Sequence, residues 1–171
     1  LANGSGPDSI EWKNNVYIRR LPGGEIQKFD GKGRLIVTQD RNGNYLQFTY
    51  NEGGNIRDAM DNSGRKLTFS YTPNKKVKKV NGPNNLKVEY DYKNLNDLKS
   101  VTNSWGNSYA YEYDDLHNLT KITFPDKTTK AMTYDGNKDW VTSFKERDNC
   151  KEEYVYELSK DDPKNHYISN V

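Results

Sequence analysis

A repeat of 21 residues is the feature that most constrains how this chain can fold. An aromatic anchor residue recurs at a constant spacing of 21, and a seventh anchor follows after 22: Phe29, Tyr50, Tyr71, Tyr92, Tyr113, Tyr134 and Tyr156. An apolar residue stands six positions after each of the first six anchors: Leu35, Ile56, Val77, Leu98, Leu119 and Trp140. Self-similarity at a fixed period of this size is typical of repeat architectures. The chain is therefore predicted to be a tandem array of one small structural unit.

The residue pattern within one period predicts a β-hairpin. Residues 46–50 (LQFTY) alternate apolar and polar side chains, as a strand with one apolar face does. Residues 30–33 (DGKG) and 40–44 (DRNGN) are turn sequences, in which glycine supplies the positive φ of a tight hairpin. Two turns in 21 residues leave room for two strands, so each repeat contributes one antiparallel hairpin.

The apolar residues of the first strand in each unit are often three positions apart, as in Val77 and Val80 or Leu119 and Ile122. In a regular strand, an odd spacing places two side chains on opposite faces. Either a β-bulge restores a common face or the second residue packs at the turn. The sequence leaves both alternatives open.

The predicted fold is all-β. About seven tandem antiparallel hairpins form a curled, strip-like or spiral sheet with its aromatic face inward, because very wide open sheets curl or split and a single layer must cover its apolar face. Only 32% of the residues are hydrophobic, but 13 Tyr, 5 Phe and 3 Trp supply large aromatic rings whose apolar surface can be buried in a fold. These aromatics argue against a disordered chain.

The predicted organisation has three parts. Residues 1–9 form a flexible lead-in, and residues 10–157 form the array, with units starting near residues 10, 29, 50, 71, 92, 113 and 134. Residues 158–171 form a C-terminal cap or tail. Charged residues and Pro163 in this last segment suit a cap, since both discourage pairing at a sheet edge.

Three segments carry a family resemblance: residues 29–50, residues 110–123 (AYEYDDLHNLTKIT) and residues 132–144 (MTYDGNKDWVTSF). They resemble the YD-repeat, or RHS-repeat, family, whose pattern is Tyr-Asp, a turn often containing Gly-Arg-Leu, a strand, a glycine turn, and then aromatic-x-Tyr-Asp. Asp30 and Asp114 keep the acidic position, whereas Asn51 and others replace it. The resemblance extends over roughly residues 10–157.

The resemblance implies a secreted or cell-surface protein; a signal peptide is absent from this sequence. Long family members wrap their sheet into a hollow shell around a toxin segment, and other members act in adhesion. This chain is short for closing such a shell, which suggests that it is part of a larger RHS-type polypeptide with a protein partner or a cell-surface carbohydrate as ligand.

The sequence predicts no catalytic residue, metal site or cofactor, so the chain is not expected to be an enzyme. His117 occupies a turn position that is Gly33 in a sister repeat, and Cys150 stands alone. No spacing matches an EF-hand loop. The 26 basic and 24 acidic residues balance, which disfavours a nucleic-acid partner. No apolar run is long enough for a transmembrane segment.

Four aromatic residues are candidate ligand-binding residues. Trp105 stands in a hairpin turn where other repeats carry polar residues, and Tyr109 follows it closely. Trp12 and Tyr17, near the N-terminal edge, are further candidates. The leading hypothesis is a non-catalytic repeat scaffold for adhesion, partner interaction or an enclosing β-shell. The alternative is a carbohydrate-binding module that uses these exposed aromatics.

Overall fold

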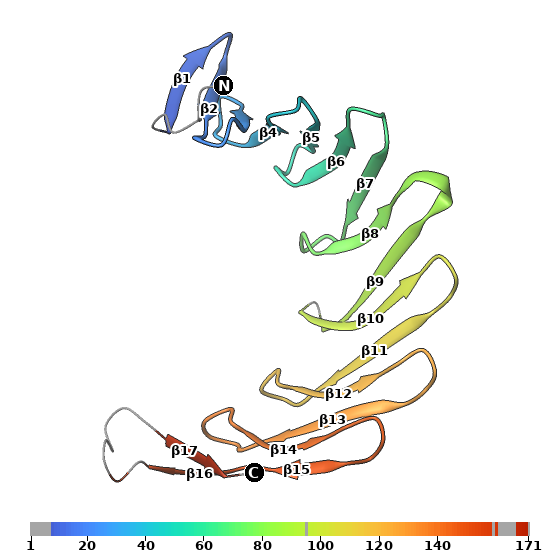
Figure 1. Ribbon diagram of the computed structural model, residues 1–171. Coiled ribbons are helices and arrows are strands. Elements are labelled where there is room, and N and C mark those ends of the chain that lie inside the picture. Colours follow the sequence, from blue (N-terminus) through green and yellow to red (C-terminus); the bar gives the residue numbers. More distant parts are fainter. Residues whose placement is uncertain (1–7, 95, 159, 161–166, 171) are drawn as a thin grey trace. The chain divides into compact units, whose positions relative to one another are not determined.

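The computed structural model describes residues 8–94, 96–158, 160 and 167–170. Fifteen strands follow one another in chain order in a single open sheet, and two further strands form a separate hairpin (Figure 1). Apart from one short 3₁₀ turn, the described elements are strands. The predicted all-β fold of tandem hairpins is therefore confirmed.

The chain divides into two compact units, Leu1–Val88 and Glu89–Val171, and each is described by itself. The elements of the first unit are β1 (Ser9–Lys13), β2 (Val16–Arg20), β3 (Ile26–Phe29), β4 (Leu35–Gln39), β5 (Tyr45–Tyr50), β6 (Ile56–Asp61), β7 (Lys66–Tyr71), β8 (Val77–Asn81) and the 3₁₀ turn η1 (Pro83–Asn85). The elements that follow are β9 (Lys87–Lys93), β10 (Asp97–Asn103), β11 (Ser108–Tyr113), β12 (Leu119–Thr123), β13 (Thr129–Tyr134), β14 (Val141–Lys145), β15 (Lys151–Glu153), β16 (Val155–Leu158) and β17 (Tyr167–Asn170).

The predicted C-terminal cap or tail contributes strand β17, which pairs with β16. Residues 159 and 161–166, on which the capping argument rests, lie outside the described residues, as do residues 1–7 of the predicted lead-in.

A β-bulge after the anchors decides between the two alternatives left open by the sequence. In β7 and β8, Phe69 lies opposite Val80, and after a register shift Tyr71 lies opposite Val77. The extra residue in β8 turns Val77 and Val80 to the same face as the aromatics. The same shift occurs at four other anchors: Phe29, Tyr50, Tyr113 and Tyr134.

Trp140, the apolar residue six positions after Tyr134, does not lie opposite that anchor. Val141 lies opposite Tyr134, because the intervening turn is one residue longer and closes with a hydrogen bond from the Asp135 N–H to the Trp140 carbonyl (2.9 Å). The Trp140 ring instead lies 4.9 Å from the Tyr156 ring.

Many of the turns share one geometry, a type I turn followed by a residue with positive φ. In residues 30–34, the Asp30 N–H bonds to the Arg34 carbonyl and the Gly33 N–H bonds back to the Asp30 carbonyl, both at 2.9 Å. The Asp30 carboxylate accepts the N–H groups of Lys32 (2.9 Å) and Arg34 (3.0 Å). His117 takes the position of Gly33 with a φ of 68°, so it is the turn residue predicted from the sequence.

Tyrosine hydroxyls connect several of the repeats to the repeat before them. The hydroxyls of Tyr50, Tyr71 and Tyr134 donate to backbone carbonyls 15 residues earlier, at 2.6, 2.6 and 2.8 Å. The acceptor for Tyr71 is Ile56, at the start of β6. The pairing of β6 with β7 reaches only as far as Asp58 opposite Thr68, so the Ile56 carbonyl lies beyond the ladder and the hydroxyl satisfies it. We call this contact the tyrosine latch.

The first anchor, Phe29, has no hydroxyl, and the backbone pairing of its strand with the preceding strand differs from that at Tyr71. The pairing of β2 with β3 runs through to Tyr17 opposite Phe29, so the backbone groups at this end are already paired. The tyrosine latch is thus consistent with a Tyr at anchors such as Tyr50, Tyr71 and Tyr134 and with a Phe at the first one.

No described residue with assigned burial is fully buried. The anchors and the apolar residues opposite them are half-buried, because a single layer of strands covers them only with side chains of neighbouring strands. The apolar face of the sheet therefore stays partly exposed to solvent.

Candidate functional site

The hairpin turns 103–107, 124–128 and 146–150 lie at the same ends of the strands in the second unit. They join β10 to β11, β12 to β13 and β14 to β15, and the antiparallel pairing of β11 with β12 places neighbouring turns on the same side. We call this side, with its aromatic residues Trp105, Tyr109 and Phe124, the aromatic edge.

Trp105 is the most exposed large apolar residue among those that the structure describes, with 74% of its surface accessible. Its backbone is fixed, since the Asn103 side chain accepts the N–H groups of Trp105 (3.0 Å) and Asn107 (3.1 Å), and Gly106 supplies the positive φ. The turn therefore presents an indole ring to solvent from a rigid backbone.

Tyr109 and Phe124 form an edge-to-face pair with ring centroids 5.6 Å apart. The Arg147 guanidinium lies 4.4 Å from the centroid of Phe124. The turn that carries Phe124 is thus in contact with the preceding hairpin through Tyr109 and with the following one through Arg147.

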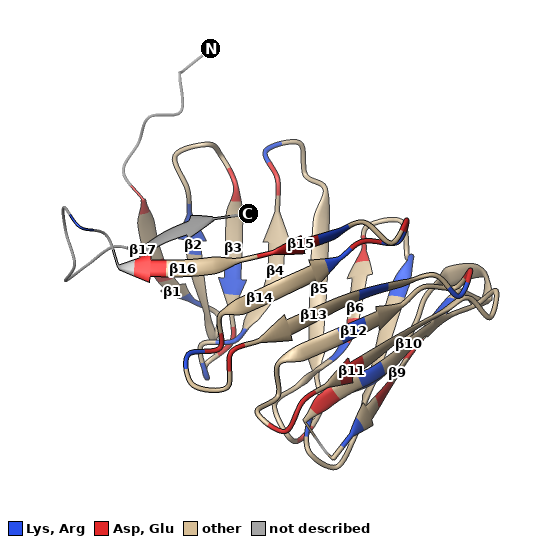
Figure 2. Ribbon diagram, turned by 90° about the horizontal axis from the view of Figure 1, so that it is seen from below, with Lys and Arg blue, Asp and Glu red and all other residues tan. Residues whose placement is uncertain are grey.

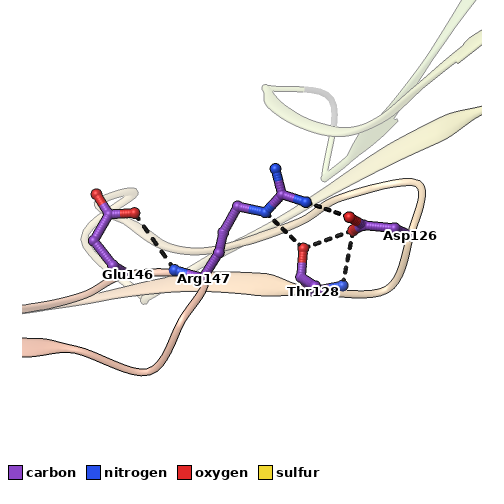
Figure 3. A network of polar contacts seen from close by, with 4 residues as sticks. All are labelled: Asp126, Thr128, Glu146 and Arg147. Carbon is purple, nitrogen blue, oxygen red and sulfur yellow. Dashed lines mark hydrogen bonds and ion pairs between the residues drawn. The ribbon is translucent and has the colours of Figure 1, made fainter.

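Two ion pairs lie on the aromatic edge. Figure 3 shows Arg147 donating to the Asp126 carboxylate and, at 2.7 Å, to the Thr128 hydroxyl, which itself donates to Asp126 at 2.6 Å. These bonds lower the pKa of the Asp126 carboxyl, and the hydrogen bond from the Thr128 hydroxyl has the largest effect. Glu146 pairs with Lys130 at 2.9 Å. Arg147 covers the face of Phe124, so the exposed ring of Trp105 is the main apolar surface of this edge.

Trp12 and Tyr17, the other predicted pair, lie together in the first unit with ring centroids 4.4 Å apart. They face each other across the hairpin β1–β2, whose two-residue turn has positive φ at Asn14 and Asn15. Trp12 thus lies opposite Tyr17, which in turn lies opposite Phe29 on β3. Trp12 is 53% exposed and Tyr17 is 42% exposed.

Sequence reasoning missed an apolar depression of about 500 Å³ on the first unit. Its lining includes Leu46, Phe48, Ala59, Leu67 and Phe69, which the register of β5, β6 and β7 places on one face. Leu46 and Leu67 are exposed. The recurring leucine four residues before the anchor was the available signal, but the pattern did not show that it stays uncovered.

Cys150 and His117 each contact an aspartate side chain. Cys150 is exposed, and a hydrogen bond with the Asp148 side chain raises the pKa of its thiol, which disfavours the nucleophilic thiolate. His117 contacts Asp97 at 2.9 Å. Among the described residues, no three His, Cys, Asp or Glu side chains could together hold a metal ion. Basic and acidic residues are interspersed within each unit (Figure 2).

Within the described part of the chain, no helix is long and apolar enough to cross a membrane.

The fold defines a repeat scaffold made of tandem β-hairpins. Residues 90–129 match the RHS Repeat family, which confirms the resemblance seen in the sequence. A comparison with curated proteins found no match.

Solved structures share the fold. The crystal structure of TcdB2-TccC3-Cdc42 superposes with a TM-score of 0.58 at 19% identity, over 70% of this chain and 7% of that chain. The structure of the Photorhabdus luminescens Tc holotoxin pore, with mutated TccC3, gives a TM-score of 0.58 at 14% identity, over 79% of this chain and 9% of that chain. This chain therefore spans less than a tenth of the length of these chains.

Proposed function

We propose that this chain is a non-catalytic scaffold segment of a larger exported RHS-type polypeptide, and that its apolar face covers part of a protein partner. The exposed apolar depression around Leu46 and Leu67 carries this proposal. A large exposed apolar surface marks an interaction site. The enclosing shell implied by the family resemblance supplies a role for such a surface.

Binding to an unfolded model polypeptide tests this proposal. We expect reduced, carboxymethylated α-lactalbumin labelled with a fluorophore to raise its anisotropy when it binds the chain. Replacing Leu46 and Leu67 with Ser should weaken binding by about tenfold or more, since each leucine loses apolar burial. Leu116→Ser is the matched control, because Leu116 is equally apolar and 58% exposed but lies in a turn of the second unit. Absence of binding by the unaltered chain contradicts the proposal.

A second candidate function is carbohydrate binding at the aromatic edge, and the exposure of Trp105 is the observation that favours it. An exposed indole ring can stack on the C–H face of a sugar. This function does not depend on the apolar depression of the first unit.

A glycan array distinguishes the second candidate. Trp105→Ala should abolish saturable glycan binding and change the free energy of unfolding by less than about 0.5 kcal/mol, because the ring lies in solvent. Leu116→Ala should leave glycan binding unchanged. Glycan binding that survives Trp105→Ala places the sugar elsewhere, and an array without signal removes this candidate.

A further inference from the structure

The apolar depression of the first unit is bordered by carboxylates. A polar depression of about 420 Å³ adjoins it, and Leu46, Asp61 and Arg65 line both depressions. Asp61 lies directly opposite Leu46 in the pairing of β5 with β6. Glu25 and Asp40 line the polar depression only. A ligand that fills the apolar depression therefore has carboxylates beside it.

The strand register places the carboxylates of Glu25 and Asp40 on the apolar face of the sheet. Thr38 lies opposite Leu46, and Asp40 follows Thr38 by two residues. Gln27 lies opposite Thr38, and Glu25 precedes Gln27 by two residues. Because alternate residues along a strand share a face, both carboxylates stand on the same side as Leu46.

The border of the apolar depression carries a net negative charge. Asp61 forms an ion pair with Arg65 at 2.6 Å, whereas Glu25 and Asp40 form no ion pair with a described residue. Arg41, in the turn that begins at Asp40, lines neither depression. Carboxyl groups are ionised near neutral pH. Two negative charges therefore lie beside apolar side chains, and no cation of the lining neutralises them.

This combination of charge and apolar surface selects the kind of partner. Like charges that face each other across an interface are unfavourable, so an acidic segment is disfavoured. A lysine or arginine side chain, in contrast, can pack its methylene stem on apolar surface while its charged head reaches a carboxylate.

The strand spacing limits how far the cation can stand from the apolar residues. Leu46 is on β5 and Glu25 directly precedes β3, so the two are two strands apart, which is about 10 Å or about three residues of an extended segment. We propose that the apolar depression binds a polypeptide segment with a Lys or Arg within about three positions of its apolar residues, and that the cation lies between Glu25 and Asp40. This inference rests on the proposed function and names the chemistry of its partner.

The test uses three fluorescein-labelled peptides that share an apolar Leu-Phe-Leu-Ile segment and differ in charge. The segment is followed by Gly-Lys-Gly-Lys in the basic peptide, by Gly-Gln-Gly-Gln in the neutral peptide and by Gly-Glu-Gly-Glu in the acidic peptide. Fluorescence anisotropy with the whole chain at low salt measures each Kd. The basic peptide should bind about fivefold more tightly than the neutral one, which is the contribution of two exposed ion pairs. The acidic peptide should bind more weakly than the neutral one.

Salt checks the electrostatic origin of this preference. In about 1 M NaCl, where the Debye length falls to about 3 Å, the basic and neutral peptides should bind with equal affinity.

A double variant tests the position of the cation. Glu25→Gln with Asp40→Asn removes both charges, and the turn should persist because Asn103 occupies the same turn position as Asp40. The double variant should bind the basic peptide about fivefold more weakly and the neutral peptide with unaltered affinity. The matched control is Asp30→Asn with Glu52→Gln, which removes the same charge from turns at the other ends of the strands. The control should keep the preference for the basic peptide.

The outcomes separate this inference from the proposed function. If the three peptides bind equally well, or if the Glu25→Gln and Asp40→Asn double variant keeps the preference, the inference is wrong while the proposed function stands. If the basic peptide binds equally well after Leu46→Ser and Leu67→Ser, binding is purely electrostatic, and the inference is wrong. If no peptide binds, the proposed function fails together with the inference.

Discussion

Replacing Tyr71 with Ala should lower the free energy of unfolding by about 3 kcal/mol, because the change removes a half-buried ring and its tyrosine latch. Burial of the side chain, which raises the pKa of the Tyr71 hydroxyl, is consistent with a ring packed against its neighbours. Tyr71→Phe keeps the ring and should cost about 1 kcal/mol, the typical worth of one hydrogen bond. Urea denaturation followed by circular dichroism measures both changes.

Tyr17→Phe is the matched control for the hydroxyl. Tyr17 lies opposite Phe29 in a ladder that is already complete, so its variant should change the free energy of unfolding by less than about 0.5 kcal/mol. If Tyr71→Phe proves as stable as the unaltered chain, the latch carries no stability and only the aromatic ring matters.

Acid should unfold the array, because many of its turns depend on an ionised aspartate. The pKa values of Asp30 and Asp114 are lowered chiefly by the backbone N–H groups of Arg34 and Asn118, respectively. The carboxyls with the same arrangement and a lowered pKa also include Asp40 and Asp61.

A pKa that is lower in the folded state than in the unfolded chain stabilises the fold above the unfolded value and loses that effect as the pH falls. The stabilisation should therefore be complete above about pH 5 and disappear progressively below about pH 4. Tryptophan fluorescence recorded during an acid titration should report a cooperative loss of structure in this range.

Asparagine turns within the chain supply the control for the acid experiment. The side-chain oxygen of Asn103 accepts N–H groups two and four residues later, as the aspartates do, but it does not titrate. Replacing Asp30, Asp40, Asp61 and Asp114 with Asn should preserve the fold at neutral pH and move the acid transition to lower pH. An unchanged transition would show that other groups control acid unfolding.

The period of 21 residues was sufficient to predict the hairpins, because alternation and turn residues are local signals. It identified the anchors, the position of His117 in a turn, and Trp105 as an aromatic residue in a turn where other repeats carry polar residues. The period could not place Trp140, since one extra turn residue shifts the register and brings Val141 opposite Tyr134.

Only the tertiary structure decided which carbonyl each tyrosine reaches, since a hydroxyl that bonds 15 residues back depends on where the ladder between two strands stops. It also decided between the two explanations of the odd apolar spacing, because a β-bulge is a property of paired strands and not of one strand. The apolar depression of the first unit likewise depends on how β5, β6 and β7 pair. The sequence determined which residues alternate and turn, and the pairing of strands determined which of them remain open to a ligand.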